Sequence, residues 1–263
     1  MSSVEAALPA VSDAHTVFLV TNFWETMNKD TEVAQGKAVT DACKQAGVQH
    51  LIFSSLRNVT EISSGRLPNV THFDGKAEIE AYIRASGISS TFVLAGLFMS
   101  NFFQFFNKQA DTYTLAWPVN LDKAQVPLFD AAEDTGMFFL CTPYPMGCAD
   151  LLDHVGKFVK PAISTFPATV GQRILAATEY YSPQRIVDEF REITGYKAQA
   201  VQIPSETFKS FLPTPVAQEM LENIQLLEDP GYFAGEPLDK SLALLDEKPT
   251  LWKEFVERNK EKF

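Results

Sequence analysis

The sequence predicts an α/β fold built on a doubly wound parallel sheet, and two observations support this prediction. Apolar runs rich in Val, Ile, Leu and Phe alternate with helical segments of about ten residues or more, which is typical of parallel strands covered on both faces. The chain also has 263 residues, 46% of them hydrophobic, and can therefore bury a substantial core. These features indicate the doubly wound class.

The first half of the chain supplies the clearest elements. Helices are expected at about 2–13, 31–46 and 73–86, and strands at TVFLVTN (16–22), HLIFSSL (50–56) and STFVLAGL (90–97). In open α/β sheets, ligands bind outside the carboxyl ends of the strands. The candidate walls of a site are therefore the three strand ends, Thr21 to Trp24, Ser54 to Leu56 and Ala95 to Phe98.

The second half is more irregular. A strand is expected at QRILAAT (172–178), followed by a helix at 182–195, where Ser182 can cap and Pro183 takes the first helical position. A strand KAQAVQIP, a helix from about 205 and a last helix at 249–263 follow. We predict a partial Rossmann domain from 1–106 with 172–185, and a smaller C-terminal α/β lobe from 107–171 with 186–263.

Charge and composition exclude several classes of protein. The 33 acidic and 22 basic residues give a formal charge of −11, which repels nucleic-acid phosphate and argues against direct nucleic-acid binding. The three cysteines and four histidines match no zinc spacing, so no metal site is expected. No apolar run approaches the roughly 20 residues that span a bilayer, and no signal peptide is evident. We expect no membrane association and a cytoplasmic location, with the nucleus as an alternative.

His72 and Lys76 are the first candidates for chemistry, because residues four apart share one face of a helix. Lys76 could be an ordinary exposed residue that pairs with Glu80 at i+4. It could instead line a site, because it follows a strand that ends in Ser54 and Ser55. A lysine can bind a hydroxyl-rich ligand and supply a proton when desolvation lowers its pKa. His72 could also supply a proton near neutral pH, or it could cap or pack.

Aromatic residues are dense in the middle of the chain. They could line an apolar substrate cleft between the lobes. A Phe stripe at helical spacing is more often packing, so we favour a core role for the set Phe98, Phe102, Phe103, Phe105, Phe106, Tyr113 and Trp117.

Several segments, taken in order, resemble the NmrA-like family of atypical short-chain dehydrogenases over nearly the whole chain. They are VFLVTNFWE, EVAQGKAVTDACKQAGVQHLIFSSL, THFDGKAEIEAYIRASG, FMSNFF, AEDTG, PSETFKSFLP and GYFAGEPLDKSLALL. The resemblance implies a Rossmann-type fold and NADP(H) as cofactor. In short-chain dehydrogenases the helix after the serine-bearing strand carries Tyr-x-x-x-Lys. Here His72 stands at the tyrosine position and Lys76 at the lysine.

The resemblance also implies roles for individual residues. Lys76 would bind the ribose hydroxyls, and Ser54 or Ser55 would lie near the nicotinamide. The implied cofactor-binding set is Thr21, Asn22, Phe23, Ser54, Lys76, Gly96 and Leu97, in which the last two support the carboxamide through the backbone. The candidate catalytic residues are Lys76, His72, Ser54 and Ser55, with no metal ligand among them.

Two departures from the family pattern stand out. Family members open with a strand and a Gly-x-x-Gly-x-x-Gly turn, whereas this chain has no glycine before Gly36, so the phosphate-binding loop is absent from it. The missing strand would lie beside 16–22 and leave an apolar edge open. Either another chain covers that edge, for example a second copy, or the sequence is N-terminally incomplete; we favour incompleteness.

The second departure is the segment from Met137 to Gly156, which interrupts the junction between Asp-Thr-Gly and Lys-Phe-Val. Gly-Met-Phe can be encoded across a GTATGT donor, and Val-Gly can span a TAG acceptor. A retained fungal intron explains the segment, and a tolerated surface insertion explains it as well. The transcript sequence decides between them.

The expected function is an NADP(H)-dependent oxidoreductase that acts on a small carbonyl, quinone or aromatic metabolite in fungal metabolism. The main alternative is a non-catalytic regulator that senses NAD(P) and contacts a transcription factor. The lost tyrosine favours the regulator, while the frequency of reductases in the family favours the enzyme. An inactive truncated fragment is the third alternative.

Overall fold

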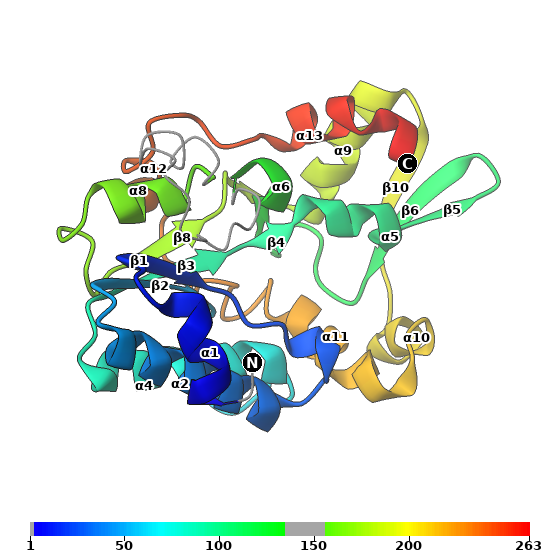
Figure 1. Ribbon diagram of the computed structural model, residues 1–263. Coiled ribbons are helices and arrows are strands. Elements are labelled where there is room, and N and C mark those ends of the chain that lie inside the picture. The colour runs from blue at the N-terminus through cyan, green and yellow to red at the C-terminus, as the bar shows by residue number, and fades with distance from the viewer. Residues whose placement is uncertain (1–2, 135–155) are drawn as a thin grey trace.

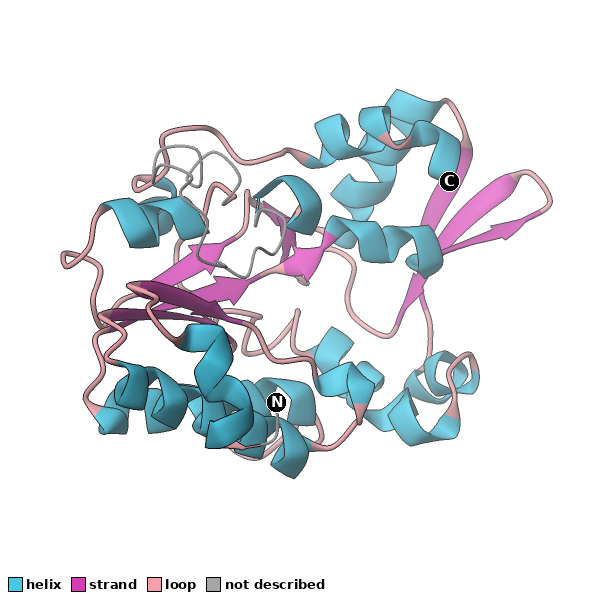
Figure 2. Ribbon diagram, viewed as in Figure 1, coloured by secondary structure: helices cyan, strands magenta, loops and turns pink. Residues whose placement is uncertain are grey.

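A four-stranded parallel sheet lies at the centre of the computed structural model, which describes residues 3–134 and 156–263 (Figure 2). Its strand order is β1 (Thr16–Leu19), β2 (His50–Ser55), β3 (Ser90–Ala95) and β8 (Arg173–Ala176). The register places Phe53 beside Phe92 and Phe92 beside Arg173. The expected α/β class is confirmed, because all three strand pairings are parallel.

Helices cover both faces of this sheet (Figure 1). One face carries α1 (Val4–Val11), α2 (Lys29–Ala46) and α4 (Thr71–Ser86), and the other carries α6 (Ala131–Asp134) and α8 (Val159–Ser164). On the α8 side, Ile52, Val93 and Ile174 of the strands pack against Phe158 and Val159. The parallel strands are therefore buried on both faces, as their continuous apolar runs require.

Helices α2 and α4 pack closely because glycine occupies position 36. A Cβ atom there would lie 2.7 Å from atoms of the Ile79 side chain, which is too close for any other residue without a shift. Helix α2 begins at a cap, since the Asn28 side chain accepts a hydrogen bond from the amide of Thr31. Helix α4 begins at Thr71, two residues before the expected start, and so includes His72.

Two small sheets and several helices complete the second half. One sheet has the order β4 (Leu97–Phe98), β7 (Val126–Phe129), β9 (Tyr180–Tyr181), and the other β10 (Lys197–Gln202), β6 (Thr112–Trp117), β5 (Phe106–Gln109). The helices are α3 (Val59–Ile62), α5 (Phe102–Phe105), α9 (Pro183–Thr194), α10 (Ser205–Ser210), α11 (Thr214–Gln225), α12 (Asp239–Leu242) and α13 (Trp252–Arg258). Single 3₁₀ turns occur at Phe23–Glu25, Met99–Asn101 and Lys260–Lys262.

The start of α9 is as predicted. The Ser182 side chain accepts a hydrogen bond from the amide of Arg185, and Pro183 is the first helical residue. Three expected elements are shorter in the structure: the first strand ends at Leu19, the strand at 172–178 covers Arg173–Ala176, and the last helix covers Trp252–Arg258. The expected strand at 90–97 is divided at Gly96, after which Leu97 pairs with Leu128 of β7.

Most of the aromatic set is core, which was the favoured interpretation. Phe102, Phe106, Tyr113 and Trp117 are all buried. Phe102 lies 4.9 Å from the ring of Trp252 between centroids, and Phe106 stacks on Phe190 at 4.5 Å. Phe98 differs, because 40% of it is exposed.

The predicted domain division stays a prediction. Helix α8 belongs to the segment 107–171, yet it packs on the sheet formed by the first domain. Residues 137–155 of the suggested insertion lie outside the described residues. On either side of it, the amide of Phe158 donates to the carbonyl of Asp134 over 3.2 Å, so the chain before and after the segment meets there.

Candidate functional site

The carboxyl ends of β1 and β2 and the first turns of α4 bring the predicted site residues together. The Lys76 ammonium donates hydrogen bonds to the carbonyl and the hydroxyl oxygen of Thr21, over 2.8 and 2.9 Å. The same nitrogen lies 5.8 Å from the centre of the Phe53 ring, next to Ser54 at the end of β2. Sequence-distant candidates therefore converge at the sheet edge where α/β folds bind ligands.

Lys76 has a buried carboxylate as its counter-ion. Its nitrogen lies 3.2 Å from Oε1 of Glu32, and only 12% of the Lys76 side chain and 1% of the Glu32 side chain are exposed. The Thr21 hydroxyl donates to the same carboxylate oxygen over 2.7 Å. The pairing of Lys76 with Glu80 that an exposed helix would give is wrong, because Lys76 faces α2 and the end of β1.

Three oxygens of the protein lie close to the ammonium of Lys76. A protonated lysine has three N–H groups; the Lys76 nitrogen donates to the two oxygens of Thr21 and forms an ion pair with one oxygen of Glu32. Desolvation by burial lowers the pKa of Lys76 below its ordinary value, although Glu32 opposes that shift. The second oxygen of Glu32 is buried without a hydrogen-bond partner in the part of the chain that the structure describes. A ligand hydroxyl could therefore exchange with one of these partners.

His72 is held by a carboxylate from the second half of the chain. Its Nδ1 lies 2.5 Å from Oε1 of Glu219 in α11, and its backbone amide donates to the same oxygen over 2.9 Å. Burial would raise the pKa of Glu219, but the hydrogen bonds from His72 and Thr71 outweigh it and hold that pKa below its usual value. Glu219 therefore engages Nδ1, and no residue in the described ranges hydrogen-bonds to the other ring nitrogen, Nε2.

No sequence signal identifies Glu219, because 147 residues separate it from His72. Their contact depends on how α11 packs near the start of α4, which local patterns do not encode.

Two aromatic rings enclose the imidazole of His72. The ring centroids of Phe23 and Trp24 lie 5.8 and 5.0 Å from it. Phe23 is 3% exposed, whereas Trp24 is 46% exposed. Trp24 therefore presents an accessible aromatic face beside the site, and the side chain of Asn22 is exposed as well.

The two serines at the end of β2 have different environments. The hydroxyl of Ser55 is buried and donates to Oε2 of Glu80 over 2.6 Å. Ser54 points to the other face and is half-buried, and no residue among 3–134 and 156–263 accepts or donates a hydrogen bond to its hydroxyl. Ser54 is thus the serine with a free hydroxyl for a ligand.

Gly96 and Leu97 lie at the same sheet edge, directly after β3. The amide of Gly96 donates to the carbonyl of Ala176 over 2.9 Å. A Cβ atom at Gly96 would lie 2.3 Å from the carbonyl oxygen of Pro127, so the close approach of that strand requires glycine. Leu97 is 6% exposed and pairs with β7. The Gly96 amide therefore already has a partner in the protein.

The arrangement fits the nicotinamide-ribose part of a dinucleotide. Lys76 and the free hydroxyl of Ser54 can bind ribose hydroxyls, and Trp24 offers a flat apolar surface. Across the described ranges, no group of three His, Cys, Asp or Glu side chains could hold a metal ion. None of the helices described there is long and apolar enough to cross a membrane.

Comparison with known proteins gives consistent matches. The model of the NmrA-like family matches residues 3–257. The NmrA-like family domain-containing oxidoreductase lnaB of Aspergillus flavus is 29% identical over 216 residues, which cover 78% of this chain and 56% of that protein. The nitrogen metabolite repression protein nmrA of Emericella nidulans is 28% identical over 222 residues, covering 81% and 55%. The chain thus spans about half the length of these relatives.

Solved structures show the same fold. The crystal structure of NmrA, a negative transcriptional regulator, in complex with NADP matches with a TM-score of 0.75 and 22% identity, covering 97% of this chain and 76% of that one. The Rossmann-type architecture inferred from the strand order therefore agrees with a solved structure.

Proposed function

The chain belongs to the NmrA-like family, and from that premise we propose that its carboxyl-edge site binds the nicotinamide riboside part of NADP(H) in an oxidoreductase. The substrate class is a small carbonyl, quinone or aromatic metabolite. The observation that carries the proposal is the convergence of Lys76, Thr21 and Ser54 at the ends of β1 and β2. Relatives named as oxidoreductases, such as lnaB, support the same reaction class.

In this proposal, NADP(H) supplies the hydride when it is bound. Lys76 binds the ribose, because a ligand hydroxyl can replace a Thr21 oxygen in its hydrogen bonding. The Ser54 hydroxyl orients the substrate or the ribose, and Trp24 excludes water from one side. Gly96 and Leu97 support the carboxamide through their carbonyl groups, since the Gly96 amide is already bonded.

His72 is the proposed proton donor in place of a tyrosine. Reduction of a carbonyl requires a proton at the nascent alkoxide, and an imidazolium can supply it near neutral pH. Glu219 orients the ring through its contact with Nδ1. Glu219 is therefore a positioning residue, which acts through His72 rather than on the substrate.

A second candidate function is a regulator that binds NADP(H) without turnover and contacts a transcription factor. The specific observation in its favour is that the Lys76 ammonium already has two hydrogen bonds to Thr21 and an ion pair with Glu32, so it is held by the protein rather than free to give a proton. Relatives named as nitrogen metabolite repression proteins support this candidate.

Substitution at Lys76 tests the proposal. We expect NADPH oxidation over a panel of aldehydes, quinones and aromatic compounds, and at least about tenfold weaker NADPH binding by Lys76→Met. The matched control is Lys37→Met, because Lys37 is a half-exposed lysine that pairs with Glu78 away from the strand ends. Binding without turnover over the whole panel would favour the regulator. Equal NADPH affinity of Lys76→Met and the parent chain would refute the site.

A further inference from the structure

The polar face of α4 continues beyond the candidate site. His72, Lys76, Glu80 and Arg84 follow one another at intervals of four residues, so they lie along one side of the helix. The first two reach the carboxyl edge of the sheet. Arg84, in the last turn, lies at the opposite edge, where its Nη1 donates to the carbonyl of Gly171 just before β8.

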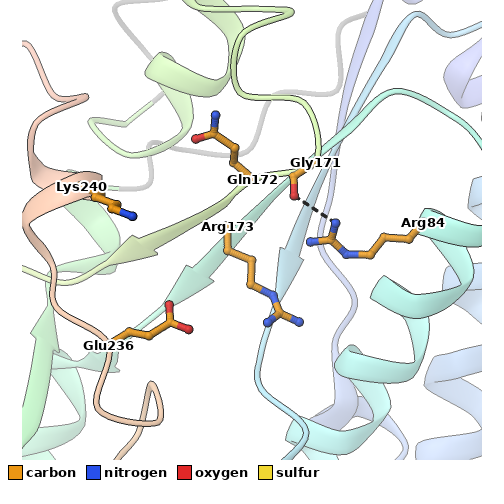
Figure 3. Close-up of a pocket in the computed structure, with 6 residues that line it drawn as sticks. All are labelled: Arg84, Gly171, Gln172, Arg173, Glu236 and Lys240. Atoms are coloured by element: carbon orange, nitrogen blue, oxygen red, sulfur yellow. Dashed lines mark hydrogen bonds between the residues drawn. The ribbon is translucent and has the colours of Figure 1, made fainter.

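An open pocket of about 710 Å³ lies at this second place. Its lining comes from the end of α4, the start of β8 and the segment that leads into α12: Arg84, Gly171, Gln172, Arg173, Glu236 and Lys240 (Figure 3). The pocket is separate from the proposed dinucleotide site, because none of the predicted site residues lines it.

Cations exceed carboxylates around the pocket. Arg84 and Arg173 share a single buried carboxylate, Glu80, with Nε to Oε1 distances of 2.9 and 2.8 Å. Among the six lining residues named above, the carboxylate is that of Glu236, which forms an ion pair with Arg57. Lys240 is exposed and has no ion pair with any residue that the structure describes.

Arg173 keeps hydrogen-bond donors free for a ligand. Its Nε is bonded to Glu80, but Nη1 and Nη2 have no acceptor within the described ranges. In Figure 3 the guanidinium of Arg173 points into the space between Glu236 and Arg84. A guanidinium edge with parallel donors matches the geometry of phosphate and carboxylate oxygens.

The excess of positive charge at this pocket contrasts with the net charge of the whole chain. The chain carries a formal charge of −11, so most of its surface repels anions. Glu80 is 2% exposed at its side chain and also accepts from Ser55, which leaves it unable to turn outward and neutralise the pocket. The cation excess is therefore built into the fold.

We propose that this pocket is an anion site that binds a phosphate dianion, either as the free ion or as the end group of a small monoester. Arg173 and Lys240 contact the phosphate oxygens from opposite sides of the pocket. Glu80 holds both guanidinium groups in place from beneath. Nothing in this proposal depends on NADP(H) binding at the other edge.

Calorimetric titration with inorganic phosphate, at an ionic strength matched with sodium chloride, tests the site. We expect saturable binding that Lys240→Gln weakens about threefold to tenfold and Arg173→Gln weakens at least about tenfold. The matched control is Arg185→Gln, since Arg185 is also a partly exposed arginine whose Nε donates to a carboxylate, at Glu189, and it does not line the pocket. Lys240→Gln keeps the test valid if Arg173→Gln is poorly folded, because the Lys240 side chain has no hydrogen bond or ion pair with the described residues.

A parallel titration with glycerol 3-phosphate distinguishes the two sources of phosphate. Tighter binding of the ester assigns the site to a phosphomonoester, and equal or weaker binding of the ester assigns it to the free ion. No saturable binding of either compound, or equal weakening by Arg185→Gln and Lys240→Gln, would overturn the proposal.

Discussion

At the carboxyl edge of the sheet, Lys76 and His72 of α4 each meet a carboxylate of their own, Glu32 and Glu219. At the other end of the same helix, Arg84 and Arg173 divide one carboxylate, Glu80. Basic side chains therefore contact buried carboxylates at both ends of α4, but at the second end two arginines share one carboxylate.

The difference indicates what each end can bind. Where the buried lysine has its own buried counter-ion, a ligand must exchange for a protein partner, which suits a hydroxyl-rich ribose more than a bare anion. Where cations are in excess, an added anion supplies a missing partner. The same helix thus supports two ligands of different chemistry.

The largest effect on this comparison is expected from Glu80→Gln. This change leaves two guanidinium groups beside each other without their shared carboxylate and should lower the free energy of unfolding by about 2 to 3 kcal/mol, a figure reduced for the partial exposure of the arginines. Urea unfolding measures it. The control is Glu78→Gln on the same helix, with a side chain that is 44% exposed and an expected loss under about 0.5 kcal/mol. Similar losses of stability in Glu80→Gln and Glu78→Gln would show that Glu80 does not stabilise Arg84 and Arg173 as described.

Coupling between Lys76 and Glu32 is expected to be next in size. A double-mutant cycle with Lys76→Met and Glu32→Gln should give an interaction energy of about 2 kcal/mol, because each single change leaves a buried polar group without its partner. Urea unfolding of the four proteins provides the values. Additive effects would mean that Lys76 and Glu32 are not paired in solution. The description of the carboxyl edge as a place where the lysine has its own counter-ion would then be wrong.

Ser54 and Ser55 of β2 are expected to differ in role, Ser55 in stability and Ser54 in ligand binding. Ser55→Ala removes a hydrogen bond to the carboxylate of Glu80 and should cost about 1.5 kcal/mol. Ser54→Ala should leave the unfolding free energy within about 0.5 kcal/mol of the parent, because its hydroxyl has no partner in the described part of the protein. Ser54→Ala should nevertheless reduce turnover if the site is catalytic. Thermal or urea unfolding, combined with the NADPH assay, distinguishes the two variants. A larger loss of stability in Ser54→Ala than in Ser55→Ala would contradict the roles given to the two serines.

The smallest effect concerns acid stability. Because hydrogen bonds from His72 and Thr71 hold the folded-state pKa of Glu219 below its ordinary value, its stabilisation is present above that ordinary value and is lost as the pH falls through the folded-state pKa. Glu219→Gln should therefore lower the free energy of unfolding by about 1 kcal/mol near neutral pH, and by less at about pH 3. Asp229→Asn serves as control, since Asp229 and its partner Arg66 are both exposed. A deficit that persists unchanged in acid would argue against the His72–Glu219 pair.

The strands and the first site residues could be predicted from sequence because their signals are local. Apolar runs marked β1, β2 and β3, and the spacing of His72 and Lys76 placed both on one side of α4. The charged partners could not be predicted. Glu32 lies in a helix whose sequence carries no signal of a buried carboxylate, and Glu219 lies in a separate part of the chain.

Two further features required the three-dimensional structure. The sequence alone offered Ser54 and Ser55 as equals, whereas strand alternation turns one toward Glu80 and the other away. The pocket at the amino edge depends on Arg84, Arg173 and Lys240, which come from three distant segments without a shared motif. Such contacts follow from the order of strands in the sheet rather than from any local pattern.

The central claim is that the two ends of α4 bind different ligands, and amide NMR of the labelled chain tests it most directly. Titration with dihydronicotinamide riboside, which carries no phosphate, should shift the signals of residues 21–24, 54 and 72–76. Inorganic phosphate should shift those of residues 84, 171–173 and 240 instead. Overlapping sets of shifted signals, or no shift at the first set with the riboside, would contradict the account.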